Sequence, residues 1–255
     1  MKLLLDILAD HYHIRQEKPE GLLYSFPAST LIEEDNLYEF LQTFGRESGV
    51  EKPEVMGIRL ASWLAFLCSG VQYAVTFYDQ LPDWSLDNLS IQLVEHKEHN
   101  EDESRSIWLS FQIDRLSILS REQDSYLWRK KVLTSFYSET IRPLFETLNN
   151  VTSISLNHCW KQLPSRLYNN VDHWLENYPE KKKKEIKVTF HILVKEIPAS
   201  CFGIEKNPFD IRFKMIQNPA HPEKQLRLKP ACCLAYLAEK GHGYCTACPL
   251  NKPSV

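Results

Sequence analysis

The sequence has few glycines and no glycine-rich nucleotide motif. Only 8 of its 255 residues are glycine, and it contains neither a G-x-G-x-x-G run nor a P-loop. We therefore expect no nucleotide or flavin site encoded in the chain. The net charge of −3 argues against a dedicated nucleic-acid binder, so no nucleic-acid partner is expected.

Long hydrophobic runs are also missing. No stretch reaches the roughly 18 consecutive apolar residues of a membrane span, and the longest candidate, Leu60–Val75, is interrupted by Ser62, Ser69 and Gln72. The apolar start of the chain is brief and is broken by Asp6, which is atypical of a signal peptide. We expect a cytoplasmic protein with no transmembrane segment.

Cysteine is scarce, yet it is concentrated near the end of the chain. Four of the seven cysteines lie within seventeen residues, as Cys232-Cys233, eleven residues, and Cys245-x-x-Cys248-Pro. Such a set suits a [2Fe–2S] cluster, a structural zinc ion or two disulfides. A reducing cytoplasm disfavours the disulfides. Of the remaining three cysteines, we interpret Cys68 and Cys159 as packed core residues.

The adjacent pair in this motif favours a cluster over zinc. Side chains of neighbouring residues diverge in both helices and strands, so Cys232 and Cys233 are poorly placed to chelate one ion together. A cluster contains two irons and can use diverging thiolates on different iron atoms. Gly241 and Gly243 lie in the intervening loop and permit positive φ angles there.

Hydrophobic periodicity predicts a mainly helical body. Two or three short helices are expected in residues 1–50, a buried helix over Val55–Tyr78, and an amphipathic helix over Leu156–Trp174 that Pro164 interrupts. The hydrophobic content of 43% is ordinary for a soluble globular protein of this length. The body is therefore expected to bury a substantial core.

The period changes to two in the middle of the chain. Residues 89–93 and 107–111 alternate apolar and polar side chains, which predicts an antiparallel hairpin with a long polar loop. That loop contains possible metal ligands, which we interpret as members of a solvated acidic loop: His96, His99, Glu101 and Glu103.

Two further elements are predicted after the hairpin. Ser120, with Gln123 three residues later, forms a capping-box pattern that opens a helix, and Pro143 should kink or restart that helix. Residues 186–194 alternate again and predict a later strand. The preceding run, Lys181–Lys184, fits a solvated face, with docking of an acidic electron donor as the alternative.

The last 55 residues differ in composition from the rest. Seven of the fourteen prolines lie from Pro198 onward, and residues 201–255 carry a charge balance of +4. Residues 209–213 alternate and predict a short exposed strand. We predict an α+β protein: a predominantly helical body with a small antiparallel sheet (1–200), and a basic C-terminal segment (201–255) that carries the cysteines and packs on the body.

Several stretches together carry a family resemblance. The terminal cysteine motif, Asn207-Pro208-Phe209 and the stretch Gln225–Lys229 resemble the C-terminal part of FhuF-type siderophore-iron reductases. Trp84–Ser90 and the apolar segment Leu60–Tyr73 resemble regions nearer the middle of that family. The likeness spans about residues 55–250, and only the cysteine motif is specific. The family pattern has ten residues between the adjacent cysteine pair and the Cys-x-x-Cys half, whereas this chain has eleven.

The resemblance implies a cytoplasmic ferric-siderophore reductase. In that family the four cysteines bind a [2Fe–2S] cluster, which assigns Cys232, Cys233, Cys245 and Cys248 as its ligands here. The implied partners are a hydroxamate- or citrate-type ferric siderophore, an electron donor such as a ferredoxin or an NAD(P)H-dependent reductase, and transiently a siderophore importer.

The basic character of the terminal segment adds candidates for the chelate contact. Four cations flank the motif and could contact an anionic chelate, or could form a solvated basic face: Arg212, Lys214, Arg227 and Lys229. Two alternative functions stay open. One is a [2Fe–2S] electron-transfer or sensor protein without a siderophore site, and the other is a structural-zinc binding protein.

Overall fold

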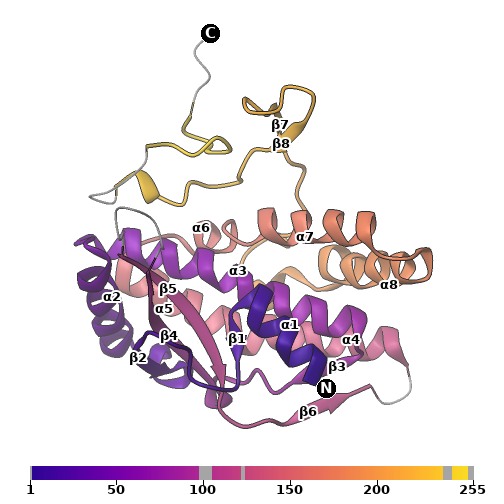
Figure 1. Ribbon diagram of the computed structural model, residues 1–255, viewed down its shortest axis with the longest axis horizontal. Coiled ribbons are helices and arrows are strands. Elements are labelled where there is room, and N and C mark those ends of the chain that lie inside the picture. The colour runs from indigo at the N-terminus through magenta and orange to yellow at the C-terminus, as the bar shows by residue number, and fades with distance from the viewer. Residues whose placement is uncertain (1, 98–104, 122–123, 238–242, 252–255) are drawn as a thin grey trace.

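The computed structural model describes residues 2–97, 105–121, 124–237 and 243–251. Its architecture is α+β, as predicted, with helices packed around one long central helix and a small sheet against one side (Figure 1). The α-helices are α1 (Lys2–Tyr12), α2 (Glu34–Ser48), α3 (Pro53–Phe77), α4 (Ser125–Ser135), α5 (Arg142–Thr152), α6 (Leu156–Trp160), α7 (Pro164–Asn177) and α8 (Glu180–His191). Two π-helical segments are η3 (Phe136–Ile141) and η4 (Ile192–Glu196), and four 3₁₀ turns are η1 (Ala28–Ile32), η2 (Leu86–Asn88), η5 (Ala199–Phe202) and η6 (Ala235–Leu237).

Helix α3 is the centre of the body, and the prediction of a buried helix here is confirmed. Pro53 lies in its first turn, where a missing N–H costs no hydrogen bond. The helix contacts α1, α2, α5, α7 and α8. A Cβ atom at Gly70 would clash with Ile14 Cδ1, so a larger residue there would force the side chains packed on α3 to shift. By length and composition α3 could cross a membrane, but 78% of its most apolar stretch is buried inside the protein.

The main sheet has four strands in the order β1 (Ile14–Arg15), β5 (Arg105–Ile113), β4 (Leu89–Lys97) and β2 (Leu22–Pro27). The β4–β5 pair is the predicted antiparallel hairpin, with Leu93 opposite Leu109. His96 lies on β4 and stacks on Trp108 at a centroid distance of 3.9 Å. His99, Glu101 and Glu103, in the predicted polar loop, lie outside the described residues.

The prediction for residues 1–50 was incomplete, because it contained helices only. Helices α1 and α2 are present, but β1 and β2 were missed. Strand β2 is largely exposed, and its side chains do not alternate between buried and exposed positions. It is defined by antiparallel pairing with β4 rather than by local pattern.

The predicted helix start at Ser120 is wrong. Ser120 ends β6 (Ile118–Ser120), which pairs with β3 (Gln80–Pro82) in a separate two-stranded sheet. Asp124 instead caps α4, its side chain accepting from the backbone N–H groups of Tyr126 and Leu127. Gln123 lies outside the described residues. A carboxylate at an N-cap satisfies free amides and complements the helix dipole.

Both predicted proline interruptions are confirmed. Pro143 lies in the first turn of α5, directly after the π-helical η3, so the long helical stretch restarts there. Pro164 begins α7 and separates it from the short helix α6. Each proline occupies the first turn of a helix, where it is tolerated.

The predicted strand over residues 186–194 is wrong, because this stretch forms the end of α8 and the start of η4. Its buried side chains are Ile186, Thr189, Ile192, Leu193 and Val194, and the first four are spaced so that they lie on one helical face. The apparent alternation arose because Val188 and Phe190 are also apolar but only partly buried. The lysine run Lys181–Lys184 lies in the first turns of α8.

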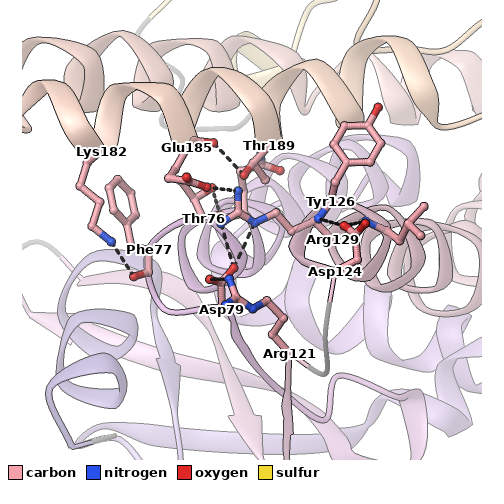
Figure 2. A network of polar contacts seen from close by, with 12 residues as sticks. Thr76, Phe77, Asp79, Arg121, Asp124, Tyr126, Arg129, Lys182, Glu185 and Thr189 are labelled. Carbon is pink, nitrogen blue, oxygen red and sulfur yellow. Dashed lines mark hydrogen bonds and ion pairs between the residues drawn. The ribbon is translucent and has the colours of Figure 1, made fainter.

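A buried ion network joins the end of α3 to α4 and α8 (Figure 2). Arg129, on α4, is only 2% exposed and contacts Asp79 at 2.8 Å and Glu185 at 2.5 Å. Arg121 binds the other oxygen of Asp79 at 2.9 Å. Two carboxylates therefore compensate the one buried guanidinium, as burial of a charge requires.

The terminal segment begins inside the body. Phe202 and Phe209 are fully buried in the main core, whereas residues 231–237 and 243–251, in yellow in Figure 1, lie above the helices in this view. The strand predicted over residues 209–213 is absent, and the short hairpin of β7 (Met215–Gln217) and β8 (Gln225–Arg227) follows instead. Residues 201–213 are thus part of the helical body.

Candidate metal centre

The β7–β8 hairpin is fixed to α7 through Arg227. The Arg227 guanidinium lies 2.5 Å from Asp172 and donates to Asn169 at 3.0 Å, both on α7. The backbone N–H of Lys229 then donates to the carbonyl of Ala247 at 2.9 Å. This last bond joins the end of the hairpin to the Cys-x-x-Cys half of the motif.

The cysteine pair Cys232-Cys233 is anchored on α6 and on the turn that follows it. Gln162 donates from Nε2 to the backbone oxygen of Cys232 at 3.2 Å, and the same oxygen lies 2.9 Å from His158 Nε2. A carbonyl only accepts hydrogen bonds, so this contact places the imidazole proton on Nε2. Ser62 on α3 donates to the Gln162 oxygen and thereby orients the amide.

The sulfurs of Cys232 and Cys248 lie 3.6 Å apart, in a buried position. A disulfide needs about 2.05 Å, so these thiols are not bonded to each other. Two thiolates at about 2.3 Å from one tetrahedral ion lie about 3.8 Å from each other. The separation therefore matches one edge of a tetrahedral metal site.

The local backbone supports this pair of sulfurs. Leu234 has a φ of 56° and directs its N–H toward Cys232 Sγ at 3.4 Å. The N–H of Cys248 donates to the carbonyl of Cys245 at 2.9 Å and closes the Cys-x-x-Cys turn. Burial raises the pKa of the Cys232 thiol to about 11, against the lowering effect of the Leu234 N–H, so the metal-free thiol is protonated at neutral pH.

The other two predicted ligands lie nearby in sequence but are differently exposed. Cys233 is half-buried. Cys245 is exposed. Among the described residues no group of three or more His, Cys, Asp or Glu side chains is gathered for a metal. The structure thus brings together two of the four predicted ligands.

The donor set fits a thiolate-bound metal in its chemistry. All seven cysteines are free, and four of them lie in this one segment. Gly243 has a φ of 72° and so uses the positive φ that glycine permits, on the Cys245 side of the loop. Gly241 lies outside the described residues.

The remaining cysteines have the environment of packed side chains. Cys68 and Cys159 are fully buried, and burial raises the pKa of Cys159 to about 12 and that of Cys68 further. Such thiols are neither nucleophilic nor available as thiolates at neutral pH. Cys201 is half-buried, and burial raises its pKa as well.

The four predicted chelate contacts have different environments. Arg212 and Lys214 are exposed to solvent. Arg227 is occupied by Asp172 and also lies 5.6 Å from the centroids of Tyr168 and Phe213, so it holds the hairpin in place. Lys229 is half-buried and lines a cavity.

That cavity, the α3–α7 cleft, has a volume of about 400 Å³ and is bounded by α3, α7 and the chain around the cysteine pair. The lining residues with polar or charged groups that can contact a ligand include Lys161, Ser165, Arg166, Asn170, Lys229 and Cys233. Cys233 therefore belongs both to the cysteine motif and to the wall of the cleft. The volume of the cleft falls within the range of small-molecule sites.

Several residues of this site were not predicted from the sequence. His158 and Gln162 carry no motif, because their role depends on a carbonyl 70 or more residues away. Lys161 and Arg166 lie on a segment whose pattern indicated only an amphipathic helix. The only available signal was the absence of acidic side chains from positions 157–171, which contain two cations, Lys161 and Arg166, and no carboxylate.

Comparison with known proteins adds no assignment. No family model matches the chain, and no curated protein matches it. The likeness of the cysteine motif to FhuF-type reductases therefore stays a hypothesis that rests on the residues themselves.

Proposed function

We propose that this protein is a ferric-siderophore reductase that uses a [2Fe–2S] cluster. The observation that carries the proposal is the buried pair of Cys232 and Cys248 sulfurs, 3.6 Å apart, within a segment of four cysteines. The cationic α3–α7 cleft beside Cys233 supports it, because many ferric chelates are anionic.

In this proposal Cys232, Cys233, Cys245 and Cys248 hold the cluster. When bound, a [2Fe–2S] cluster supplies single electrons at a potential set by its charge, hydrogen bonds and exposure. The chain contributes the Leu234 N–H near Cys232 Sγ and a buried position for Cys248. Its cations on the cleft wall attract and orient the chelate.

The reaction consumes one electron per iron. The Fe³⁺ of the chelate is reduced to Fe²⁺, and a ferredoxin or an NAD(P)H-dependent reductase supplies the electron. Siderophores bind Fe³⁺ through hard oxygen donors, for which the larger and less charged Fe²⁺ is a poorer match. Reduction therefore releases the metal into the cytoplasm, which is the location that this chemistry suits.

Metal analysis and turnover test the proposal together. Protein purified without oxygen should be reddish-brown and contain about two iron and two acid-labile sulfide per chain. With a chemical reductant it should convert a ferric siderophore into Fe²⁺ that a ferrous-selective chelator traps. A coloured protein without turnover would instead favour an electron-transfer or sensor role.

A structural zinc site is the second candidate. The Cys232–Cys248 distance fits a tetrahedral zinc ion equally well, because the metal–sulfur bond lengths are similar. A colourless protein that contains stoichiometric zinc after native expression would establish this alternative and overturn the reductase.

A further inference from the structure

The α3–α7 cleft has an unbalanced charge. Three cations line it, Lys161, Arg166 and Lys229, and none of its described lining residues is acidic. Within the described parts of the chain no carboxylate forms an ion pair with any of these three. Arg227 next to the cleft is by contrast neutralised by Asp172. Uncompensated cations that converge on a cavity attract an anion.

Arg166 is, like Lys161 and Lys229, a half-buried cation on the cleft wall. Burial lowers its pKa to about 10, so the guanidinium is still charged at neutral pH. It lies 3.3 Å from the centroid of the Phe66 ring on α3, and this contact fixes its position on the cleft wall. A half-buried, oriented cation without a carboxylate partner leaves a positive potential in the cleft, which attracts an anion.

The cleft also contains polar atoms that have no partner. Ser165 Oγ and Asn170 Nδ2 are buried and make no hydrogen bond within the described residues. Buried polar groups are normally satisfied, and a rotation of either side chain toward the cleft would supply a partner for a ligand oxygen. Ser165 and Arg166 lie in the first turn of α7, whose N-terminus has no side-chain cap and carries the positive end of the helix dipole.

We propose that the α3–α7 cleft binds a small polycarboxylate, which makes a carboxylate-type ferric chelate the substrate class if the proposed reductase function holds. The three cations belong to separate places, the end of α6, the first turn of α7 and the segment after β8. Such a spread suits several carboxylates on one ligand better than a single compact phosphate. The wall shared with Cys233 places the chelate beside the cysteine motif.

Gallium complexes test binding without redox chemistry, because Ga³⁺ resembles Fe³⁺ in its ligand preference and is not reduced. Titration of the full chain with Ga³⁺–citrate, followed by calorimetry, should show binding that weakens as salt rises. Lys161→Gln and Lys229→Gln should each lower the affinity for Ga³⁺–citrate about tenfold, because each removes one hydrogen bond to a charged group. Lys224→Gln removes an exposed lysine from the same segment and should change the affinity less than about twofold.

Two further probes decide the ligand class. Inorganic phosphate and a neutral gallium trishydroxamate should bind at least about tenfold more weakly than Ga³⁺–citrate, because neither presents several carboxylates. Equal binding of phosphate, or equal affinities in all three lysine variants, would overturn the inference. Ser165→Asp places a carboxylate in the cleft and should abolish Ga³⁺–citrate binding, and thermal unfolding of each variant verifies that the fold is intact.

The two proposals fail in distinguishable ways. Reduction of a ferric trishydroxamate by a protein that does not bind Ga³⁺–citrate would refute the polycarboxylate cleft and leave the reductase standing. Lysine-dependent binding of Ga³⁺–citrate by a protein without iron or turnover would refute the reductase and leave the cleft standing.

Discussion

His158 Nε2 lies 2.9 Å from the backbone carbonyl oxygen of Cys232, although 74 residues separate the two in sequence. The contact joins α6 to the first cysteine of the motif and holds the adjacent pair at the surface of the body. Because His158 binds the backbone rather than the sulfur, it acts as a positioning residue whatever metal the cysteines hold.

Loss of this contact should weaken metal retention. We expect His158→Ala to lower the metal affinity of the purified protein about tenfold, in the range typical of partners that orient a ligand. Competition with a chelator, followed by metal analysis, measures the change. His158→Gln, which keeps a donor, should restore part of the affinity, and His173→Ala, at an exposed position on α7, should leave it unchanged. A loss of affinity in His173→Ala equal to that in His158→Ala would refute the positioning role.

Serine at the seven cysteines should divide them into two groups. Cys232→Ser, Cys233→Ser, Cys245→Ser and Cys248→Ser should deplete or distort the cluster, because an alkoxide is a harder and more basic ligand than a thiolate. Cys68→Ser and Cys159→Ser should keep iron content and spectrum while losing about 1–2 kcal/mol of stability, since both side chains are buried.

Cys201→Ser is the most informative control in that series. Cys201 lies in the same basic segment and is half-buried. The expected result is an unchanged visible spectrum and iron content. Loss of the cluster in Cys201→Ser, together with its retention in Cys233→Ser, would show that Cys201 replaces one member of the adjacent pair.

The parts of the fold that the sequence predicted are those with a strong local signal. Helix α3 is apolar around its whole circumference, and β4 and β5 alternate cleanly, so burial alone determines each of them. Residues 186–194 misled the prediction because their helical face and their alternation coincide over a short stretch. Strand β2 was not predicted, because it is defined by its pairing with β4, which is a long-range contact.

The candidate site shows the same division. The cysteine motif is a local pattern and could be read from spacing. The α3–α7 cleft could not, because Lys161, Arg166 and Lys229 meet only after α7 and the terminal hairpin have packed together. For the same reason Arg227 and Lys229 looked equivalent in sequence, although Asp172 neutralises the first alone.

His13 should make the stability of the protein fall in mild acid. Its ring packs edge-on against Trp63, Phe66 and Trp108, and burial, followed by the charges of Arg15 and Arg166, lowers its pKa to about 4. The unfolded chain binds this proton near pH 6.5. The stability that the neutral His13 ring contributes to the folded state is therefore fully present above pH 6.5, and it is lost as the pH falls toward 4.

Denaturant unfolding between pH 7 and pH 4 measures this effect. His13→Asn removes the titrating ring and tolerates the φ of 57° at this position. Its stability should decline less over this interval than that of the natural sequence, even if it starts lower at pH 7. His11→Asn changes an exposed histidine two residues earlier and should keep the original slope. Parallel slopes for all three proteins would rule out His13 as the source.

The ion network of Figure 2 supplies a comparison between a buried and an exposed arginine that share one carboxylate. Arg129 is 2% exposed and binds both Asp79 and Glu185, whereas Arg121 is 44% exposed and binds Asp79 alone. We expect Asp79→Asn to destabilise the fold by about 3 kcal/mol, because it leaves the buried Arg129 with only one charged partner. Asparagine tolerates the positive φ of Asp79, so the change removes charge without adding backbone strain.

Arg121→Met is the matched control, and it should cost less than about 1 kcal/mol, as is usual for an exposed ion pair. Urea unfolding followed by circular dichroism measures both variants on the same scale. If Arg121→Met destabilised the fold as much as Asp79→Asn does, the exposed ion pair would be the main source of the stability that the network contributes. The buried Arg129 would then contribute through the packing of its stem rather than through its charge.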